Sequence, residues 1–305
     1  MASQPWDSII VGGGPAGLSA ALTLGRCRRS VLVCDAGLPR NRRSDHLHAY
    51  LTRDGIAPSE FLHIGREQLA PYETVRRLHC EVIEARREGD LFEVVLADGA
   101  RERGRTLLLA TGVVDHVPPL EGIEPLYGKS VHHCPYCDGW EWRDAPIAVY
   151  GRGDAKGAGL ALMMLQWSPD VVLLTDGPSA LSPDERERLD ARGVSVREDP
   201  IARLEGIDGK LQRVVFGDGR SLERSALFFN TGQHQRSPLA EMLGCTYDDR
   251  GGIATEASDV ATCVPGVYVA GDASRDVQLV VVAAAEGVKA ASAINRNLLT
   301  ADGLA

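Results

Sequence analysis

Two cysteines three residues apart, Cys134 and Cys137, are the side chains of this sequence best suited to chemistry. They lie in the segment HHCPYCDG at residues 132–139. Two sulfurs at this spacing can close a small-ring disulfide and exchange two electrons as a pair. A glycine-rich turn follows the pair and another opens the chain, which indicates a dinucleotide beside a dithiol. The combination favours flavin-linked disulfide chemistry.

The reactivity of this pair depends on its neighbours, because the thiolate is the reactive form of cysteine. Pro135 predicts a turn that opens into a helix, whose N-terminus would favour a thiolate. His132 and His133 can supply charge or act as bases, and His133 is the candidate catalytic histidine. A hydrogen-bonded structural role is the alternative for either histidine. These residues do not indicate the direction of electron flow.

Half of a zinc site is the other chemistry open to the pair, with a neighbouring histidine as third ligand. The sequence has no second Cys-x-x-Cys and no His-x-x-x-His to complete a tetrahedral set, so we expect no metal site. The other five of the seven cysteines have no close partner along the chain. We expect them to be small buried apolar residues without a redox role: Cys27, Cys34, Cys80, Cys245 and Cys263.

The first glycine-rich turn, GGGPAG at residues 12–17, directly follows the apolar run Ile9–Val11. Its glycines allow the backbone to approach a pyrophosphate and a helix to pack closely on the strand, and the helix N-terminus offers amides to the anion. Asp35 ends the next strand, where a carboxylate can accept hydrogen bonds from a ribose hydroxyl. The residues expected to bind the cofactor are Gly12, Gly14, Pro15, Ala16, Gly17, Asp35, Ala110, Thr111, Gly112, Gly271 and Asp272.

The second turn carries Gly151 and Gly153 and is a less regular nucleotide site. Lys156 stands where close helix packing usually needs a small residue, although the glycine after it can partly compensate. The next strand ends at TDG, residues 175–177, where the carboxylate of Asp176 would meet a 2′-phosphate with no arginine to neutralise it. NADPH is therefore disfavoured. NADH binding and an empty remnant of a site both stay open.

An α/β fold is indicated by the apolar periodicity and turn residues of the first third of the chain. Strands are expected at 7–11 and 31–34 with a helix at 16–24 between them, which forms a β-α-β unit. Short strands separated by Gly-Asp and Asp-Gly turns follow between 80 and 112. They indicate a β-meander.

The same order recurs later in the chain, which indicates a diverged duplication. Strands at 147–150 and 171–174 enclose a helix at 155–167, and a second meander begins after residue 201. The segment from 267 and a helix at 280–298 are expected to complete the first domain. The predicted fold class is therefore α/β, with two Rossmann-like three-layer nucleotide-binding domains, each with a β-meander and the second inserted into the first.

Composition restricts the class of protein. The chain has 305 residues, 44% apolar and 25% charged, which suits two globular domains. A net charge of −9 disfavours nucleic acid as a partner. The sequence has no run of about 18 apolar residues and no secretory leader pattern, so we expect a cytoplasmic protein without a membrane partner. Short basic clusters at 26–29 and 40–43 suit a solvated face or a bound diphosphate.

Taken together, these motifs resemble the low-molecular-weight thioredoxin reductase family over nearly the whole chain. The opening Gly-x-Gly-x-x-Gly, Ala110-Thr111-Gly112, Cys-x-x-Cys-Asp-Gly, the second Gly-x-Gly and Gly271-Asp272 follow that family's order. The resemblance implies an FAD-binding domain at 1–117 and 236–305 and an inserted domain at 118–235 that carries NADPH and the dithiol. It also implies a homodimer, and a domain rotation that presents the flavin alternately to nucleotide and dithiol.

The resemblance also assigns roles by position. Cys137 matches the thiol that meets the flavin, Cys134 the outward thiol that exchanges with substrate, and Asp138 the acid that relays a proton. A helix cap or turn residue is the alternative role for Asp138. Gln278 and Leu279 stand where the family has an Arg-Gln pair, and they join the expected cofactor-binding residues.

Further departures place the sequence between two branches of the family. The His-Arg-Arg element that holds the 2′-phosphate is replaced by TDG at 175–177. Gly139-Trp140-Glu141 resembles the gliotoxin-type dithiol oxidases, relatives that close disulfides in small molecules and pass electrons to oxygen. Those relatives, however, often carry histidine where this chain has Asp138.

The resulting interpretation is an FAD-dependent dithiol/disulfide oxidoreductase. It would move two electrons between flavin, the cysteine pair and an external thiol or disulfide. The expected partner is a thioredoxin-like protein or a small-molecule dithiol, and NADH is a candidate donor where NADPH is doubtful. Three alternatives stay open: an oxygen-using dithiol oxidase, a ferredoxin-linked reductase, and a flavin redox sensor that is not an enzyme.

Overall fold

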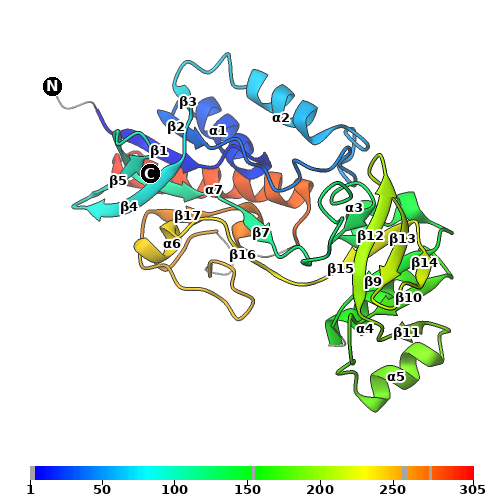
Figure 1. The fold of residues 1–305 in the computed structure, drawn as a ribbon. Helices are drawn as coiled ribbons and strands as arrows, with labels where there is room; N and C mark the ends of the chain where they lie inside the picture. Colours follow the sequence, from blue (N-terminus) through cyan, green and yellow to red (C-terminus); the bar gives the residue numbers. More distant parts are fainter. Residues whose placement is uncertain (1–3, 153–154, 256–259, 275–276) are drawn as a thin grey trace. The chain divides into compact units, whose positions relative to one another are not determined.

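Parallel β-sheets form the centre of each of the two compact units into which the chain folds (Figure 1). The computed structural model describes residues 4–152, 155–255, 260–274 and 277–305. Unit 1 comprises Met1–Arg42, Ala49–Val114 and Gln233–Ala305, and unit 2 comprises Arg43–His48 and Asp115–Gly232. The inclusion of residues 43–48 in unit 2 is a feature that the sequence did not indicate.

The sheet of unit 1 has the order β3-β2-β1-β6-β5-β4, and β17 also pairs with β6. The pairings among β1, β2, β3, β6 and β17 are parallel, whereas β4, β5 and β6 form an antiparallel meander. The strands are β1 (Trp6–Val11), β2 (Val31–Asp35), β3 (Val75–His79), β4 (Val82–Glu88), β5 (Leu91–Leu96), β6 (Arg101–Leu109) and β17 (Val267–Val269).

Both faces of this sheet are covered. Successive strand residues point to opposite faces, and Ile9 and Ile10 are both fully buried. Ile10 belongs to a core cluster with the apolar residues of three helices, α1 (Pro15–Arg26), α2 (Pro58–Glu67) and α7 (Val280–Ala301). Ile9 belongs to a second cluster that includes Leu239 of α6 (Leu239–Met242). This layered arrangement explains why the central strands read as continuous apolar runs.

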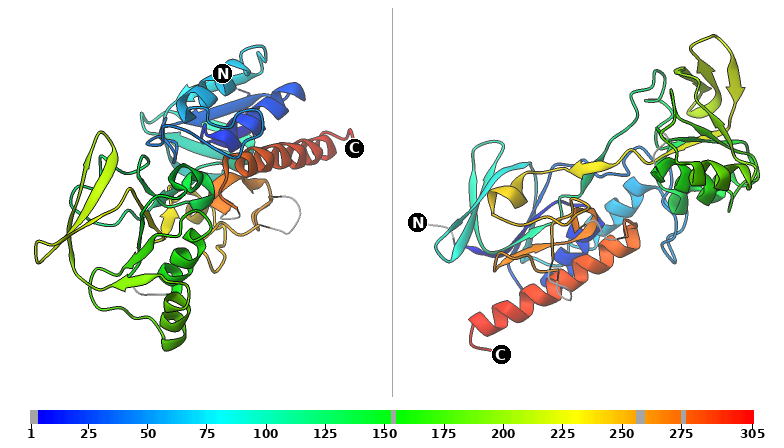
Figure 2. Two further views of the ribbon diagram at one scale, coloured as in Figure 1. Left: turned by 90° about the vertical axis from the view of Figure 1, so that its right-hand side faces the viewer. Right: turned by 90° about the horizontal axis from the view of Figure 1, so that it is seen from below.

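Helix α7, drawn in red in Figure 2, packs along α1. A Cβ atom at Gly287 of α7 would overlap the carbonyl oxygen of Ala16 of α1. The glycine is therefore required where the two helix backbones meet, because no side chain fits between them. This contact fixes the first turn of α1 against α7.

Unit 2 repeats the three layers. Its parallel sheet has the order β11-β10-β9-β15-β8. Helices α4 and α5 share a core cluster with one face, and the antiparallel sheet β12-β13-β14 shares a cluster with the other. The elements are β8 (Val131–His132), β9 (Ile147–Tyr150), α4 (Ala155–Met164), β10 (Val171–Leu174), α5 (Pro183–Asp190), β11 (Ser195–Arg197), β12 (Ile201–Ile207), β13 (Lys210–Phe216), β14 (Ser221–Glu223) and β15 (Ala226–Phe229).

Besides the short segment 43–48, the chain enters unit 2 within β7 (Val113–Asp115) and returns to unit 1 at β16 (Gln233–Gln235). These two strands pair with each other in a two-stranded sheet. Among the described helices, none is long and apolar enough to cross a membrane.

The predicted fold class is confirmed, and the strands predicted at 147–150 and 171–174 have those bounds in the structure. Several elements were not predicted, among them α2, β3 and α5. A signal for α5 was present, because Ser182 and Glu185 form a reciprocal capping box ahead of its first turn. The helix predicted to reach residue 167 ends at Met164.

The prediction that all five cysteines outside the pair are buried is wrong for three of them. Cys34 and Cys245 are buried, Cys80 is half-buried, and Cys27 and Cys263 are exposed. Cys27 caps the C-terminus of α1, and Cys263 lies in a turn before β17, so both occupy places where the chain meets solvent.

A nearly buried carboxylate, Glu93 of β5, joins the three strands of the first meander. Arg86 of β4 and Arg101 of β6 each approach its Oε1 to 2.5 Å, and Nε of Arg103 lies 3.2 Å from Oε2. Only 3% of the Glu93 side chain is exposed. The hydrogen bond from Arg101 is the main cause that lowers the pKa of Glu93, with Arg103 and Arg86 contributing.

Replacing Glu93 with glutamine is expected to lower the Tm at neutral pH, because the amide leaves the arginines without a counter-charge. Since the pKa of Glu93 is lowered by folding, its contribution is complete above the ordinary value of 4.5 and is lost as the pH falls below it. Thermal unfolding of Glu93→Gln and wild type should therefore show a Tm difference that shrinks in acid. The exposed control Glu88→Gln should change little, and a pH-independent difference for Glu93→Gln would contradict this role.

Candidate redox site

Cys134 and Cys137 form a disulfide with a Cα–Cα distance of 5.3 Å, within the usual range. Cys134 caps the N-terminus of α3 (Pro135–Asp138), a single helical turn. The 3₁₀ helix η1 (Trp140–Trp142) follows it. The first sulfur therefore lies two residues beyond the end of β8, on a short turn held by the parallel sheet.

The shortness of α3 changes one expectation from the sequence. A helix dipole sums over many aligned peptide groups, and a four-residue turn supplies few. The backbone N–H of Cys137 instead donates a hydrogen bond of 3.2 Å to Sγ of Cys134. In the reduced pair, this donor would favour a thiolate at Cys134.

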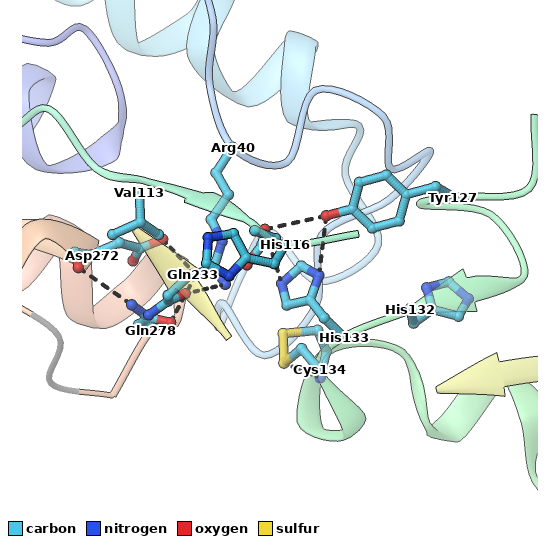
Figure 3. A network of polar contacts seen from close by, with 12 residues as sticks. Arg40, Val113, His116, Tyr127, His132, His133, Cys134, Gln233, Asp272 and Gln278 are labelled. Atoms are coloured by element: carbon cyan, nitrogen blue, oxygen red, sulfur yellow. Dashed lines mark hydrogen bonds and ion pairs between the residues drawn. A yellow bond between two sulfur atoms is a disulfide. The ribbon is translucent and has the colours of Figure 1, made fainter. Parts of the chain in front are cut away.

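His133 has polar partners within unit 2, and Figure 3 shows it beside Tyr127. Its Nδ1 lies 3.4 Å from the Tyr127 hydroxyl, and its Nε2 lies 3.8 Å from Oδ2 of Asp115. Tyr127 itself donates to Oδ2 of Asp115 over 3.2 Å. The side chain of His133 is 30% exposed, so this candidate catalytic histidine keeps access to solvent.

His132 is the more deeply buried histidine, with 5% of its side chain exposed. Its Nε2 accepts a hydrogen bond of 3.0 Å from the indole N–H of Trp142. Its Nδ1 lies 3.4 Å from Oδ1 of Asp138. The histidine that meets the motif's acid is thus His132, whereas sequence reasoning selected His133. Adjacent residues at a strand end point to different sides, and the sequence did not show which side faces Asp138.

The first glycine turn has the geometry of an anion site. Gly12 has a φ of +113°, and a Cβ atom there would overlap the carbonyl oxygen of Ala110. In contrast, a Cβ atom built at Gly14 meets no heavy atom of the described chain within 4 Å apart from Gly14 itself and its two chain neighbours. Gly14 caps α1 and has no side chain to occupy the backbone N–H groups of Ala16 and Gly17 in the first turn. This open helix N-terminus fits a pyrophosphate.

Asp35 lies against the same turn, at the end of β2. Its Oδ1 accepts a hydrogen bond of 2.9 Å from the N–H of Gly37, and its Oδ2 accepts one of 3.3 Å from Arg66. A Cβ atom at Gly13 would overlap the Asp35 carboxylate, so turn and carboxylate touch. The position suits an acceptor for a ribose hydroxyl beside the pyrophosphate.

The carboxyl ends of four parallel strands bring the remaining predicted residues to one edge of the sheet. β1 leads into Gly12, β2 ends at Asp35, and β6 leads into Ala110-Thr111-Gly112. β17 leads, through Ala270, into the 3₁₀ helix η2 (Gly271–Ser274). Ligands of open α/β sheets bind at this edge, so the predicted set occupies the expected place.

Arg40 joins the η2 segment to two glutamines elsewhere in the chain and was missed as a site residue. Its guanidinium donates to Oδ2 of Asp272 at 2.8 Å, to Gln278 at 2.9 Å and to Gln233 at 3.0 Å (Figure 3). No sequence signal connects residues 232 positions apart, so Arg40 was noticed only as part of a basic cluster.

A buried carboxylate holds the turn at Gly271. Oε2 of Glu286, on α7, accepts hydrogen bonds from the N–H of Gly271 at 2.6 Å and from the hydroxyl of Ser274 at 3.1 Å. Leu279 caps α7 and, being apolar, leaves the amides of the first turn available. The open Gly14 cradle, the Asp35 acceptor and this second helix N-terminus fit a flavin dinucleotide.

The second glycine turn is only partly described, because Gly153 lies outside the described residues. A Cβ atom at Gly151 would lie 2.5 Å from Cα of Gly157. Gly157 therefore provides the close packing of helix on strand that Lys156 cannot provide. Lys156 itself is exposed.

Asp176, after β10, is engaged by its own unit. Its Oδ1 accepts a hydrogen bond of 2.8 Å from the N–H of Ile201, and its Oδ2 accepts one of 3.4 Å from Tyr150. Nη2 of Arg152 lies 4.0 Å from the same carboxylate. The expectation that no arginine accompanies Asp176 is therefore wrong, because Arg152 reaches it from the second glycine turn.

No metal site is evident among the residues that the structure describes: they contain no group of three or more His, Cys, Asp or Glu side chains placed to hold an ion. Both thiols of the Cys-x-x-Cys motif are joined in the disulfide.

Comparison with known proteins agrees with this geometry. A family model described as pyridine nucleotide-disulphide oxidoreductase matches residues 6–287. The chain belongs to this family. It is 33% identical over 278 residues to thioredoxin reductase tcpT of Claviceps purpurea, covering 87% of this chain and 86% of the relative.

Solved structures show the same likeness for this oxidoreductase. The structure of HlmI superposes with a TM-score of 0.93 at 37% identity, covering 98% of this chain and 94% of that one. The structure of an oxidoreductase from Agrobacterium tumefaciens superposes with a TM-score of 0.90 at 34% identity, covering 97% of this chain and 99% of that one. The oxidoreductase is thus a thioredoxin reductase-like FAD enzyme, and the resemblance noted from its motifs is confirmed.

Gly14 offers a test of the cofactor cradle that separates binding from folding. Its φ of −76° suits any residue, and a side chain there meets open space, so Gly14→Val should fold. The valine would block the approach of a pyrophosphate, and the purified variant should retain less than about a tenth of the wild-type FAD. The control Gly159→Val, on the exposed side of α4, should keep its flavin. Full FAD content in Gly14→Val would rule out this cradle.

Proposed function

We propose that this enzyme performs thiol–disulfide exchange between the Cys134–Cys137 pair and an external dithiol or disulfide, with FAD as its second two-electron carrier. The observation that carries the proposal is the disulfide of a Cys-x-x-Cys motif whose first sulfur accepts a backbone N–H. A sulfur held next to such a donor is prepared to be a thiolate.

The exchange balances in two steps on the sulfurs. In the direction of substrate reduction, the Cys134 thiolate attacks an external disulfide, forms a mixed disulfide and releases one substrate thiolate. Cys137 then attacks Sγ of Cys134, which closes the Cys134–Cys137 disulfide and releases the second thiolate. Two electrons pass to the substrate, and Asp138 supplies a proton to a leaving thiolate. Oxidation of an external dithiol is the same sequence reversed.

FAD, when bound, supplies a carrier that accepts or donates the electron pair of these sulfurs. The chain's own residues hold it: Gly12, Gly14 and the first turn of α1 bind the pyrophosphate, and Asp35 binds a ribose hydroxyl. Asp272, Gln278 and the N-terminus of α7 form the other polar contacts. Arg40 orients Asp272 and Gln278 together.

The substrate is a thioredoxin-like protein or a small-molecule dithiol. Similarity to tcpT, which is named a thioredoxin reductase, supports the protein substrate. Two aromatic side chains next to the pair are well exposed, Tyr136 at 69% and Trp140 at 64%, and offer apolar contact to either kind of substrate. Homodimer formation is proposed on the family resemblance alone.

Serine substitutions test the role of the pair. Cys134→Ser and Cys137→Ser are each expected to reduce disulfide turnover to less than about 1% of wild type, because a single thiol cannot close the ring that releases the product. The matched control is Cys263→Ser, which changes an exposed free cysteine and should retain wild-type turnover. Steady-state assays with a thioredoxin-like protein and with dithiothreitol make the measurement. Undiminished turnover in both pair variants would remove the dithiol from the mechanism.

We further propose that NADH is preferred to NADPH at the second nucleotide turn. A carboxylate at the end of the second β-α-β strand accepts from ribose hydroxyls and repels a 2′-phosphate. Asp176 is such a group, and Arg152 at 4.0 Å offsets only part of its charge because its own side chain is 71% exposed.

Anaerobic stopped-flow reduction tests this preference. Wild type should respond to NADH at concentrations on the order of tenfold lower than NADPH. Asp176→Asn removes the charge, keeps an acceptor for the N–H of Ile201 and tolerates the positive φ of +52°. This variant should therefore show a smaller difference between the NADH and NADPH concentrations needed to reduce the flavin. Equal reduction of wild type by both nucleotides would overturn the preference. Reduction by a dithiol but by neither nucleotide would favour an oxygen-using oxidase or a ferredoxin-linked reductase.

A further inference from the structure

We propose that His132 is a positioning residue, whose buried imidazole orients the carboxyl group of Asp138 for proton transfer at the Cys134–Cys137 pair, and that Trp142 fixes the tautomer this requires. The inference rests on the proposed function, because it takes Asp138 to exchange a proton with the sulfurs during thiol–disulfide exchange.

Trp142 determines which nitrogen of His132 carries the hydrogen. An indole N–H can only donate, so Nε2 of His132, 3.0 Å away, must accept. In a neutral imidazole the hydrogen then resides on the other nitrogen. Nδ1–H therefore faces Oδ1 of Asp138, 3.4 Å away. The neutral ring in this tautomer satisfies both partners at once.

The ring of His132 has little freedom to move. β8 pairs in parallel with β15 and sets His132 opposite Phe228. Ring centroids lie 5.3 Å apart for His132 and Phe228 and 6.0 Å apart for His132 and Trp142. Only 5% of the side chain is exposed. A ring packed in this way keeps one rotamer, so its N–H points in a fixed direction and can orient a neighbouring carboxyl group.

Asp138 contacts this fixed ring through its side chain and Cys134 through its backbone. It is the last residue of α3, and its N–H donates to the carbonyl oxygen of Cys134 over 3.2 Å. Asp138 also follows Cys137 directly in the chain, so its side chain starts from the residue next to the disulfide. The Asp138 side chain is 20% exposed, whereas that of His132 is closed off from water.

The proton transfer has a defined balance. The Asp138 carboxylic acid gives its proton to a thiolate released from a disulfide, becomes a carboxylate, and recovers a proton from water. The N–H of His132 stabilises that carboxylate and keeps one oxygen turned inward, which leaves the other for the sulfur and water. At 3.4 Å the contact is longer than an ordinary hydrogen bond, as catalytic hydrogen bonds often are before substrate binds.

Three substitutions at residue 132 separate positioning from packing. The amide nitrogen of asparagine takes the place of Nδ1, so His132→Asn keeps a donor for Asp138 and loses only the bond from Trp142. His132→Gln extends its amide toward Trp142 instead. His132→Leu has no polar group for either Asp138 or Trp142. Trp142→Phe removes the indole N–H, so the hydrogen of His132 can move to Nε2.

The experiment measures kcat and KM for disulfide turnover in each variant, with Tm and FAD content recorded for every preparation. We expect kcat to fall about tenfold in His132→Leu and His132→Gln with KM within about twofold of wild type, because the substrate still binds but protons move more slowly. His132→Asn should retain at least about half of the wild-type kcat. The kcat of Trp142→Phe should lie between that of His132→Asn and those of His132→Leu and His132→Gln.

Two results would overturn the inference while leaving the proposed function intact: an unimpaired kcat in His132→Leu, or a loss in His132→Asn as large as that in His132→Leu. The second result would show that only the packing of the imidazole matters. Wild-type enzyme that exchanges with neither dithiols nor disulfides would overturn the proposed function together with the inference. If every variant at residue 132 fails to fold, Trp142→Phe decides alone, and a kcat equal to wild type in that variant overturns the inference.

Discussion

The parallel pairing of β8 with β15 determines the placement of the redox site. β8 is the two-residue edge strand of the unit 2 sheet, and its register sets the buried Val131 opposite Leu227 and the buried His132 opposite Phe228. The Cys-x-x-Cys turn begins two residues later, so this short strand determines where the sulfurs lie. A fixed start of the Cys-x-x-Cys turn matters because thiol–disulfide exchange needs the attacking sulfur in line with the bond that it breaks.

The two units use one plan in different ways. In unit 1 the glycine turn opens onto free space at Gly14, and the carboxyl ends of four parallel strands supply polar groups around it. In unit 2 the corresponding turn packs Gly151 against Gly157, and the carboxylate that follows the next strand, Asp176, is engaged by Ile201 and Tyr150. The two units thus differ at this turn: it is open in unit 1 and closely packed in unit 2.

Local features were predictable from the sequence, and contacts between distant residues were not. Glycine turns, apolar runs and the Cys-x-x-Cys spacing encode structure within a few residues, which is why the β-α-β units and the disulfide followed from them. Arg40 reaches Asp272 across 232 positions, and the exposure of Cys27 and Cys263 depends on where helices and turns meet solvent. The choice between His132 and His133 depended on which side of β8 faces Asp138, and no periodic pattern spans a two-residue strand.

The central claim is that the flavin and the Cys134–Cys137 disulfide are two separate two-electron carriers in one chain. Anaerobic titration of the purified flavoprotein with dithionite, followed by the flavin absorbance, counts the electrons taken up per chain. The account predicts four electrons for wild type, two for the flavin and two for the disulfide, and only two for Cys137→Ser. Full reduction of the wild-type protein by two electrons would contradict it, because the disulfide would then take no part in the electron transfer.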